Sequence, residues 1–501
     1  MQEEVNMSKK ELVALVLGVI LVLIAPMAEA QNLGFSEFPI AVGEESAFCG
    51  GGASSNTNGL IAILGDAQSR YNITAQLISQ TGISGSRISL GQATTAPIPA
   101  GLPLVAFDGT NYLVVWLKGI SSTNYEVYGQ FIDPSGNLVE SAFQIATTNA
   151  EDEESLRTLA IAFGGATYLV TWVNNDALIG RLIDKSGNLV GTEISITDSA
   201  RENAVAFDGT NYLVAWVDQI HGVTDTSISA QLISQQGTLV GGNFIVDDSS
   251  YPSDNPIAIG FDGSRYLIVF HEEEEIDVEN EEWDLYARFV TTAGTVAERI
   301  AIADAPGSQE FPAIAFDGTN YLISWFDEST GSSKGKFFNT SGAPVEPEFT
   351  IFSPLENKFP LLTGVSFASD RFCAVTTRVD ENFTDGDVYG VFISPLTEID
   401  NKNPHSAPAT FELMGNYPNP FNASTCIKYT LPENAQVEIA IYNIQGQLVR
   451  TLSRGEEPSG THIVVWDGKD NIGKNVSSGV YLFRLKTPAG IQEMRKMLLL
   501  R

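Results

Sequence analysis

The sequence VAFDGTNYLVVW at residues 105–116 decides the fold, because the chain repeats it along most of its length. In most copies, two short apolar runs flank an Asp-Gly pair. This is a strong β-hairpin signal, because glycine readily adopts positive φ and aspartate hydrogen-bonds to its own backbone. Further copies are IAFGGATYLVTW at 161–172, VAFDGTNYLVAW at 205–216, IGFDGSRYLIVF at 259–270, IAFDGTNYLISW at 314–325 and a degenerate VSFASDRFCAVT at 365–376.

The second half of the repeat supplies two more strands. VYGQFI and LVESAFQI follow the first copy, separated by turn residues 133–137, and similar pairs follow the later copies. Four short strands in roughly fifty residues are typical of a β-propeller blade. Runs such as YLVVW are apolar at successive positions, as expected for a strand that is buried on both faces between neighbouring blades.

The strand count predicts an all-β, seven-bladed β-propeller with four-stranded blades at residues 31–395. A degenerate first hairpin at 46–64 completes seven copies, and EFPIAV at 37–42 resembles the fourth strand that the last copy lacks. We therefore expect the N-terminal strand to close the last blade and remove an exposed sheet edge. The repeats resemble the FDGTNYLVVW-type repeats of secreted bacterial β-propeller proteins.

Two sets of repeated residues are interpreted as packing residues. Tryptophans end four of the second strands, where we expect them to fill space between blades: Trp116, Trp172, Trp216 and Trp325. Each third strand carries a small residue, which we expect to let aromatic side chains of the adjacent blade approach closely. These small residues are Ala75, Gly129, Gly180, Ala230, Ala287, Gly335 and Gly390.

The first thirty residues have the pattern of a secretory signal peptide. Lys9 and Lys10 precede an apolar run at 12–26, and Ala28-Glu29-Ala30 forms a small-residue cleavage site. An uncleaved anchor is the alternative, but the run is shorter than the roughly 20 residues that span a bilayer. The pattern predicts a secreted or outer-cell-surface protein whose mature chain has no membrane span.

The chain is strongly acidic, with 28 basic and 61 acidic residues and a formal charge of −33. Such a charge repels nucleic acids and anionic membrane surfaces, so neither is expected as a partner. It would attract cations or a basic partner, and the simpler alternative is that the charge keeps the protein soluble outside the cell.

The turns of a propeller divide between two faces. Here the first–second and third–fourth turns are short and uniform, whereas the connections on the opposite face, which we call the varied face, differ in length and composition. Divergent loops on a rigid scaffold are typical of recognition surfaces. The aspartates of the uniform turns are therefore interpreted as turn formers, with cation binding as the alternative: Asp108, Asp208, Asp262 and Asp317.

The varied face carries two acidic segments, residues 271–284 and 380–387. Closely spaced carboxylate and amide oxygens are the ligands that Ca²⁺ prefers, although the spacing does not match an EF-hand. A solvated acidic loop is the alternative. The candidate calcium ligands are Glu272, Glu274, Asp277, Asp380, Asn382, Asp385 and Asp387, and no other cofactor is predicted.

No catalytic residue is assigned. The segment Gly331 to Gly335 matches G-x-S-x-G, but it precedes a predicted third strand, whereas a nucleophile elbow joins a strand to a helix. Hydrolysis by a carboxylate pair stays open, because acidic residues are plentiful and the sequence does not give their separations.

Residues 396–410 have the polar, proline-rich composition of a linker, and 411–501 contain several short strands typical of a small β-sandwich. The motifs YPNPFN, IKYTLP, VEIAIYNIQGQLVRTL, GTHIVVWDG, SSGVYLFRL and KMLLLR resemble the type A C-terminal sorting domain of type IX secretion. This resemblance implies an Ig-like fold, the type IX secretion machinery as a partner, and recognition through the final strand: Lys496, Met497, Leu498, Leu499, Leu500 and Arg501. A purely structural sandwich is the alternative.

Together these features predict a secreted or cell-surface binding protein whose varied acidic face recognises an extracellular glycan or protein. Two other functions stay open. One is a polysaccharide-active hydrolase or lyase that uses carboxylates on that face, and the other is a structural surface-layer component.

Overall fold

The computed structural model forms only β-strands as regular elements in the described residues, so the all-β prediction is confirmed. The chain divides into two compact units, residues 1–395 and 396–501. No helix in the described part of the chain is long and apolar enough to cross a membrane. The predicted signal peptide and linker lie outside the described residues, which are 37–42, 47–55, 58–65, 69, 72–79, 82–92, 102–121, 124–149, 159–218, 227–248, 256–277, 280–355, 358–368, 371–380, 386–395, 412–417, 425–432, 434–457, 460–466, 468–487 and 492–499.

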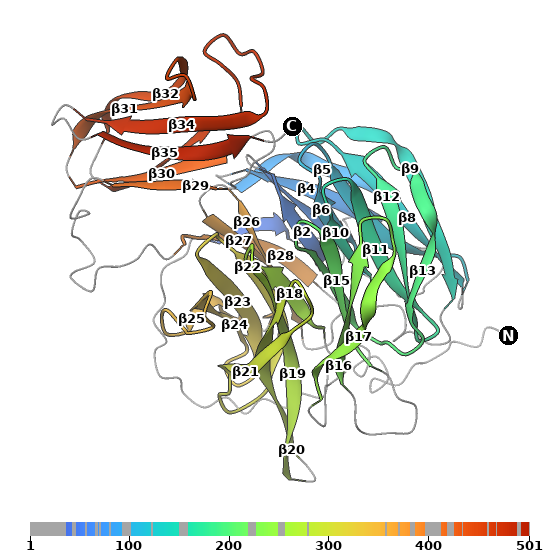
Figure 1. The fold of residues 1–501 in the computed structure, drawn as a ribbon. Helices are drawn as coiled ribbons and strands as arrows, with labels where there is room; N and C mark the ends of the chain where they lie inside the picture. Colours follow the sequence, from blue (N-terminus) through green and yellow to red (C-terminus); the bar gives the residue numbers. More distant parts are fainter. Residues whose placement is uncertain are drawn as a thin grey trace. The chain divides into compact units, whose positions relative to one another are not determined.

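The described part of the first unit forms seven antiparallel four-stranded sheets (Figure 1). Six of them use four consecutive strands, hydrogen-bonded in chain order. Sheet by sheet, these strands are β2 (Phe48–Ser54), β3 (Gly59–Leu64), β4 (Asn72–Ser79) and β5 (Gly82–Gln92); β6 (Leu104–Phe107), β7 (Tyr112–Gly119), β8 (Asn124–Ile132) and β9 (Leu138–Asn149); β10 (Ala160–Phe163), β11 (Thr167–Asn174), β12 (Ala177–Asp184) and β13 (Leu189–Thr197); β14 (Asn203–Phe207), β15 (Asn211–Val217), β16 (Ile228–Ser234) and β17 (Leu239–Asp247); β18 (Ala258–Phe261), β19 (Arg265–Asp277), β20 (Asn280–Thr291) and β21 (Val296–Ala303); β22 (Gln309–Phe316), β23 (Asn320–Asp327), β24 (Ser332–Asn339) and β25 (Phe349–Phe352).

The seventh sheet joins the two ends of the unit. Its order is β1 (Phe38–Ala41), β28 (Gly386–Ile393), β27 (Arg371–Asp380) and β26 (Lys358–Ala368), so the N-terminal strand pairs with β28 as predicted. Glu37, just before β1, accepts two hydrogen bonds from the guanidinium of buried Arg378, at 2.7 and 2.8 Å. A bidentate pair of this kind fixes direction as well as distance, and it ties the N-terminal segment to the last sheet.

The first strands of successive sheets contact one another in chain order, from β2 through β6, β10, β14, β18 and β22 to β26, and β26 contacts β2. Buried apolar clusters fill the space between neighbouring sheets; one of them, for example, joins the sheet of β7 and β8 to that of β11. The four predicted tryptophans lie in these clusters or beside them and are at most 2% exposed. The sheets are therefore arranged as blades.

The repeat stabilises itself through its own aspartate and tyrosine. In each Asp-Gly turn, the aspartate Oδ1 accepts hydrogen bonds at 2.7 Å from the backbone amides two and three residues later, as at Asp208. The tyrosine at the start of the second strand then donates to a backbone carbonyl just before or at the first residue of the second strand of the preceding sheet. These bonds are Tyr112 to Asn58, Tyr168 to Asn111, Tyr212 to Thr167 and Tyr266 to Asn211, at 2.5 to 3.3 Å. In these four cases a copy holds the turn of the copy before it, whereas the Tyr321 hydroxyl has no hydrogen-bond partner among the described residues.

The glycines among the small residues of the third strands have a different reason from the one predicted. A Cβ atom at Gly129 would lie 3.0 Å from Phe143, and one at Gly335 would lie 2.7 Å from Ile351, both on the fourth strand of the same sheet. At Gly390 the neighbouring side chain is Phe38 of β1, at 2.5 Å. The prediction that adjacent blades approach here was therefore wrong, because the space is filled by the blade's own fourth strand.

The second unit consists of two sheets. The described strands form one sheet in the order β29 (Glu412–Tyr417), β30 (Thr425–Leu431) and β33 (Gly460–Trp466), and another in the order β32 (Leu448–Glu457), β31 (Ala435–Asn443), β34 (Gly479–Lys486) and β35 (Gln492–Leu499). Residues from both sheets, including buried Trp466 and Phe483, share one apolar core. The predicted β-sandwich is therefore confirmed.

Candidate functional site

In the uniform turns of the first unit, the side-chain oxygens already accept hydrogen bonds from backbone amides of the same turn. Besides the Asp-Gly turns, Asp133, Asp184 and Asn339 each accept backbone amides two and four residues later in the third–fourth turns. These side-chain oxygens form turns of the Asx type, which favours the structural interpretation of this face over cation binding.

The acidic segment predicted as a loop on the varied face is a hairpin. Strands β19 and β20 extend to Asp277 and from Asn280, and together they are longer than the second and third strands of the other sheets (Figure 1). The register places Glu274 opposite Glu282 and Glu275 opposite Glu281. The sequence prediction was wrong here because the ladder begun by YLIVF continues through residues of low strand propensity.

The base of this hairpin carries a network of charged side chains. Arg299 on β21 pairs with Glu272 and lies 3.9 Å from Asp247 of the preceding sheet, and its guanidinium lies 3.5 Å from the ring centre of Tyr286. Arg288 donates to Asp247 at 2.5 Å. Glu272 therefore has a basic partner within the protein, so its role as a calcium ligand would require that pair to open.

The structure places the other candidate calcium ligands as follows. Asp387 accepts a hydrogen bond from Lys358 at 2.6 Å, and Asp380 ends β27. Glu274 and Asp277 lie in β19, with side chains outside the description, and Asn382 and Asp385 fall outside the described residues. Among the described residues, no group of three or more His, Cys, Asp or Glu side chains is placed to hold a metal ion.

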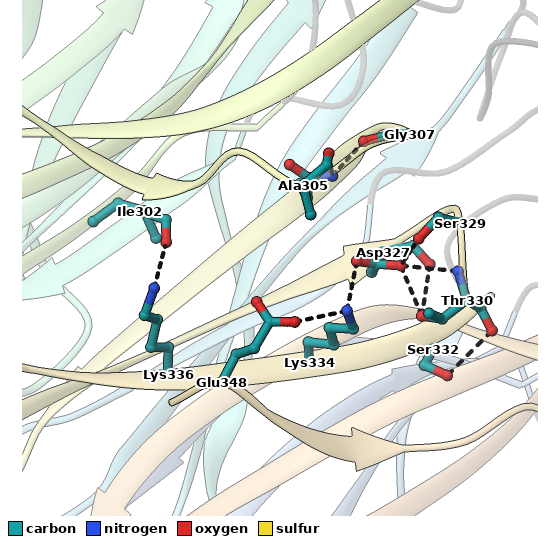
Figure 2. A network of polar contacts seen from close by, with 11 residues as sticks. Ile302, Ala305, Gly307, Asp327, Ser329, Thr330, Ser332, Lys334, Lys336 and Glu348 are labelled. Atoms are coloured by element: carbon teal, nitrogen blue, oxygen red, sulfur yellow. Dashed lines mark hydrogen bonds and ion pairs between the residues drawn. The ribbon is translucent and has the colours of Figure 1, made fainter. Parts of the chain in front are cut away.

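The turn between β23 and β24 contains a buried ion pair (Figure 2). Asp327 accepts hydrogen bonds from Ser329 and Thr330 and lies 2.9 Å from Lys334, which also reaches Glu348 at 2.8 Å. Burial acts to raise the pKa of Asp327, but the hydrogen bonds from Lys334, Ser329 and Thr330 outweigh it and lower the pKa. Lys334 belongs to the G-x-S-x-G match, and this match leads directly into strand β24.

His271, on β19 at the base of the acidic hairpin, is only 3% exposed. Neither ring nitrogen has a hydrogen-bond partner among the described residues. Its register partner is Leu285, which belongs to the apolar core between this sheet and the next. Burial lowers the pKa of His271 to about 3, so the ring is neutral at neutral pH.

A second buried titratable group, Glu310, was not found by the sequence analysis. It is the second residue of β22, which begins on the varied face, and it is 4% exposed. Its Oε2 has no hydrogen-bond partner among the described residues. Burial, and then the nearby carboxylate of Glu328, raise the pKa of Glu310 to about 8.

The connection before β22 is held by acidic side chains from two directions. Glu282 of the hairpin accepts a hydrogen bond from the Gly307 amide at 3.1 Å, and Glu328 accepts one from the Ser308 amide at 3.3 Å. Gln309 donates to Ala305 at 2.7 Å and to Gly307. These contacts fix the start of β22 and so position Glu310.

Several phenylalanines surround the start of this strand. Phe326, opposite Glu310 in the register, packs in a cluster with Leu361 and Val379. The half-buried rings of Phe48, Phe311 and Phe359, from the first strands β2, β22 and β26, pack against it. We call these four phenylalanines, with Leu361 and Val379, the phenylalanine cluster. The only signal for the phenylalanine cluster in the sequence is the segment QEFP at 309–312, which has no counterpart before the other copies of the repeat.

The C-terminal candidates occupy the edge of the sandwich. Lys496 to Leu499 lie in β35, where Met497 and Leu499 are buried in the core, whereas Lys496 is exposed. Leu500 and Arg501 fall outside the described residues.

Residues 422–490 match the FlgD Ig-like domain family. The match agrees with the Ig-like sandwich but overturns the resemblance to a type IX sorting domain, since no such domain is found. Short motifs such as YPNPFN and SSGVYLFRL did not separate the two families. The sorting role of Lys496 to Arg501 and the type IX partner rested on that resemblance, and both lose their basis.

Several solved structures share the propeller class at low similarity. They include the β-propeller domain of the Trilobed protease from Pyrococcus furiosus (12% identity, TM-score 0.44, 70% of this chain and 94% of that chain) and the Dos1 propeller (9%, 0.39, 88% and 96%). A fungal alcohol oxidase of the AA5 family in complex with copper gives 12%, 0.46, 93% and 99%. At this level the similarities carry no functional information. No curated protein matches the chain.

Proposed function

We propose that the first unit is a closed seven-bladed β-propeller that binds a positively charged extracellular partner through its varied face. The observation that carries this proposal is the difference between the uniform and the varied face. On the uniform face the aspartates are occupied by their own turns. On the varied face, the register of β19 and β20 places glutamates opposite one another. The repeated sequence does not require this arrangement.

The ring closure is supported by two features. First strands contact one another in chain order and β26 contacts β2, while β1 completes the seventh sheet. A closed ring gives the varied face a fixed geometry, and rigid scaffolds with divergent connections are suited to recognition.

Charge favours a basic partner over a neutral one. With a formal charge of −33, the chain would attract cationic proteins over a distance of about a Debye length and repel anionic ones. The signal-peptide pattern of residues 1–30 supports an extracytoplasmic location. Analysis of the mature N-terminus after expression would test this location, since cleavage after Ala30 is expected.

A protein and glycan array probed with the purified full chain tests the binding proposal. We expect basic proteins or amino-sugar glycans to be retained at low salt and released as salt rises. The double variant Glu274→Gln/Glu275→Gln should weaken this retention severalfold. Glu193→Gln/Glu298→Gln, which removes two exposed charges from the outer strands β13 and β21, is the matched control and should not. Equal loss in both variants would contradict a role for the varied face.

Hydrolysis of a polysaccharide is a second candidate, favoured by one observation. Glu310 and Glu328 are neighbouring carboxyl groups of which one has a raised pKa, a pattern that glycosidases use for acid–base catalysis. Release of reducing sugar by the wild-type chain, but not by Glu310→Gln, would support it. Absence of any product across the glycan set would rule it out in favour of binding.

A further inference from the structure

We propose that Glu310, Glu328 and the phenylalanine cluster form a binding site for an organic ammonium group, such as a lysine side chain of the partner. The inference rests on the proposed function and deepens it, because it names the chemical group that the varied face recognises. The proposed site lies at the start of the first strand β22, whereas the acidic hairpin is formed by β19 and β20.

The first argument is the unpaired state of Glu310. Several other buried or half-buried acidic side chains are matched by a basic group, as Asp247 is by Arg288, Asp327 by Lys334 and Asp387 by Lys358, while buried Asp108 accepts hydrogen bonds from the amides of its own turn. No ion pair of Glu310 is found in the described part of the chain, although the residue is 4% exposed. A buried carboxyl without a partner is costly, so its presence calls for an explanation.

The second argument is the aromatic surface beside it. Glu310 and Phe326 are register partners and so lie on the same face of their sheet. Phe48, Phe311 and Phe359 come from three different first strands and keep part of their surface exposed. Aromatic ring faces attract cations, and the attraction grows when water is excluded. A carboxylate beside several aromatic rings therefore favours an ammonium group over a neutral ligand.

The third argument is backbone strain. Phe311 has a φ of +53°, and the pairing of β22 with β23 shifts register between Glu310 and Ala313. A bulky residue in the left-handed region is strained, and such residues cluster at functional sites. The repeat does not require it, because the equivalent residues of other copies are Leu102, Glu202 and Pro256. The bulge places the Phe311 ring and the Glu310 carboxyl where a regular strand would not.

Protonation should be linked to binding. Because burial and Glu328 raise the pKa of Glu310, the group is mostly protonated near pH 7 without ligand. An ammonium group favours the carboxylate, so binding should release a proton below pH 8. The strands packed against β22 carry further charged groups with partners of their own: Lys358 with Asp387, Asp327 with Lys334, Glu272 with Arg299 and Arg288 with Asp247. They also carry the titratable groups His271, Glu282 and Asp284 on β19 and β20.

The test is calorimetric titration of the full chain with N-acetyl-lysine methylamide and, as the neutral probe with the same four-carbon side chain but no ammonium group, N-acetyl-norleucine methylamide. We expect the lysine derivative to bind at least tenfold more tightly. Its affinity should rise up to tenfold per pH unit below about pH 8 and then level off, with proton uptake by the buffer. Equal binding of the two probes, or binding independent of pH from 6 to 8, would overturn the proposal.

Variants separate the site from the fold. Glu310→Gln keeps the shape of the neutral acid and should fold, yet it should lose at least tenfold in affinity together with the pH dependence. Phe311→Leu should weaken binding severalfold and keep the pH dependence, while Glu298→Gln should change neither. If Glu310→Gln binds like the wild type, the site is wrong. Loss of array binding in the hairpin variant with intact lysine binding would confirm both proposals separately, whereas array binding without lysine binding would overturn this one alone.

Discussion

Tyr212 illustrates how a repeated residue contributes to this protein. Its hydroxyl donates to the Thr167 carbonyl at 2.5 Å and lies 3.1 Å from the Thr167 hydroxyl, so it joins two blades. Its ring lies 5.0 Å from that of Phe207 on the strand before it. Burial raises the pKa of Tyr212 to about 12, so the hydroxyl stays a hydrogen-bond donor at every physiological pH.

We predict that Tyr212→Phe lowers the free energy of unfolding by about 1 kcal/mol, because it removes the buried hydrogen bond to the Thr167 carbonyl, which keeps only its bond from the Gly164 amide. Urea unfolding followed by tryptophan fluorescence measures the change. Thr167→Val, which removes only the threonine hydroxyl, is the control and should cost less. An unchanged midpoint for Tyr212→Phe would mean that the contacts between blades are carried by packing alone.

His271 makes stability depend on pH in a defined direction. Its pKa is about 3 in the folded chain and 6.5 when solvated, so the unfolded chain binds more protons between these values. Stability from this group is therefore complete above pH 6.5 and decreases as the pH falls toward 3. Glu310, with its raised pKa, acts in the opposite sense and favours the folded state at low pH.

We predict that His271→Leu reduces the loss of stability between pH 6.5 and 4, while the wild type and a surface control such as Glu298→Gln retain it. Chemical unfolding at a series of pH values gives the slope. A slope identical to that of the wild type would show that His271 is already solvated or paired in the folded protein.

At the scale of elements, the register of the acidic hairpin of β19 and β20 pairs glutamates with glutamates. Glu275 and Glu281 are register partners, as are Glu274 and Glu282. Like charges directly opposite one another in an antiparallel pair are destabilising, and salt screens the repulsion.

We predict that Glu275→Lys stabilises the protein by roughly 0.2–1 kcal/mol at low salt, because it replaces repulsion across the strands by attraction. The gain should shrink at high salt, and Glu275→Gln should give part of it. Differential scanning calorimetry at two salt concentrations measures both effects. A destabilised Glu275→Lys variant would argue that the two strands are not paired at this position in solution.

At the scale of the whole molecule, the first unit depends on its N-terminal strand. β1 covers the edge of β28, Phe38 fills the space above Gly390 and stacks on Phe392 at 5.0 Å, and Glu37 neutralises Arg378. Loss of these contacts would leave an open sheet edge and a buried guanidinium without a carboxylate partner.

We predict that deletion of residues 31–44 lowers the melting temperature by several degrees or causes aggregation. Light scattering and calorimetry of the truncated chain measure the two outcomes. The point variant Glu37→Gln isolates the charge contribution and should cost less than the deletion. A truncated chain that melts like the full one would exclude β1 as the closing strand.

Local chemistry alone determined much of this architecture. Asp-Gly pairs between apolar runs specify hairpins within a few residues, and their repetition predicts four-stranded blades and the pairing of β1 with β28. Similar local logic predicted the burial of Trp216 and its equivalents, because a residue copied around the chain serves the scaffold. The C-terminal sandwich followed from strand spacing, whereas its family did not, since short turn motifs are shared between Ig-like domains.

Only the tertiary structure decided the features that depend on distant or irregular contacts. The Glu-rich segment reads as a loop, yet it continues a ladder because strand pairing overrides weak propensity. Gly335 is small because its own fourth strand needs the space. Glu310 became a candidate only when β2, β22 and β26 brought phenylalanines from three distant segments beside a carboxyl that the fold buries. The sequence alone does not predict that these side chains lie together, because burial and charge pairing arise from the packing of whole blades.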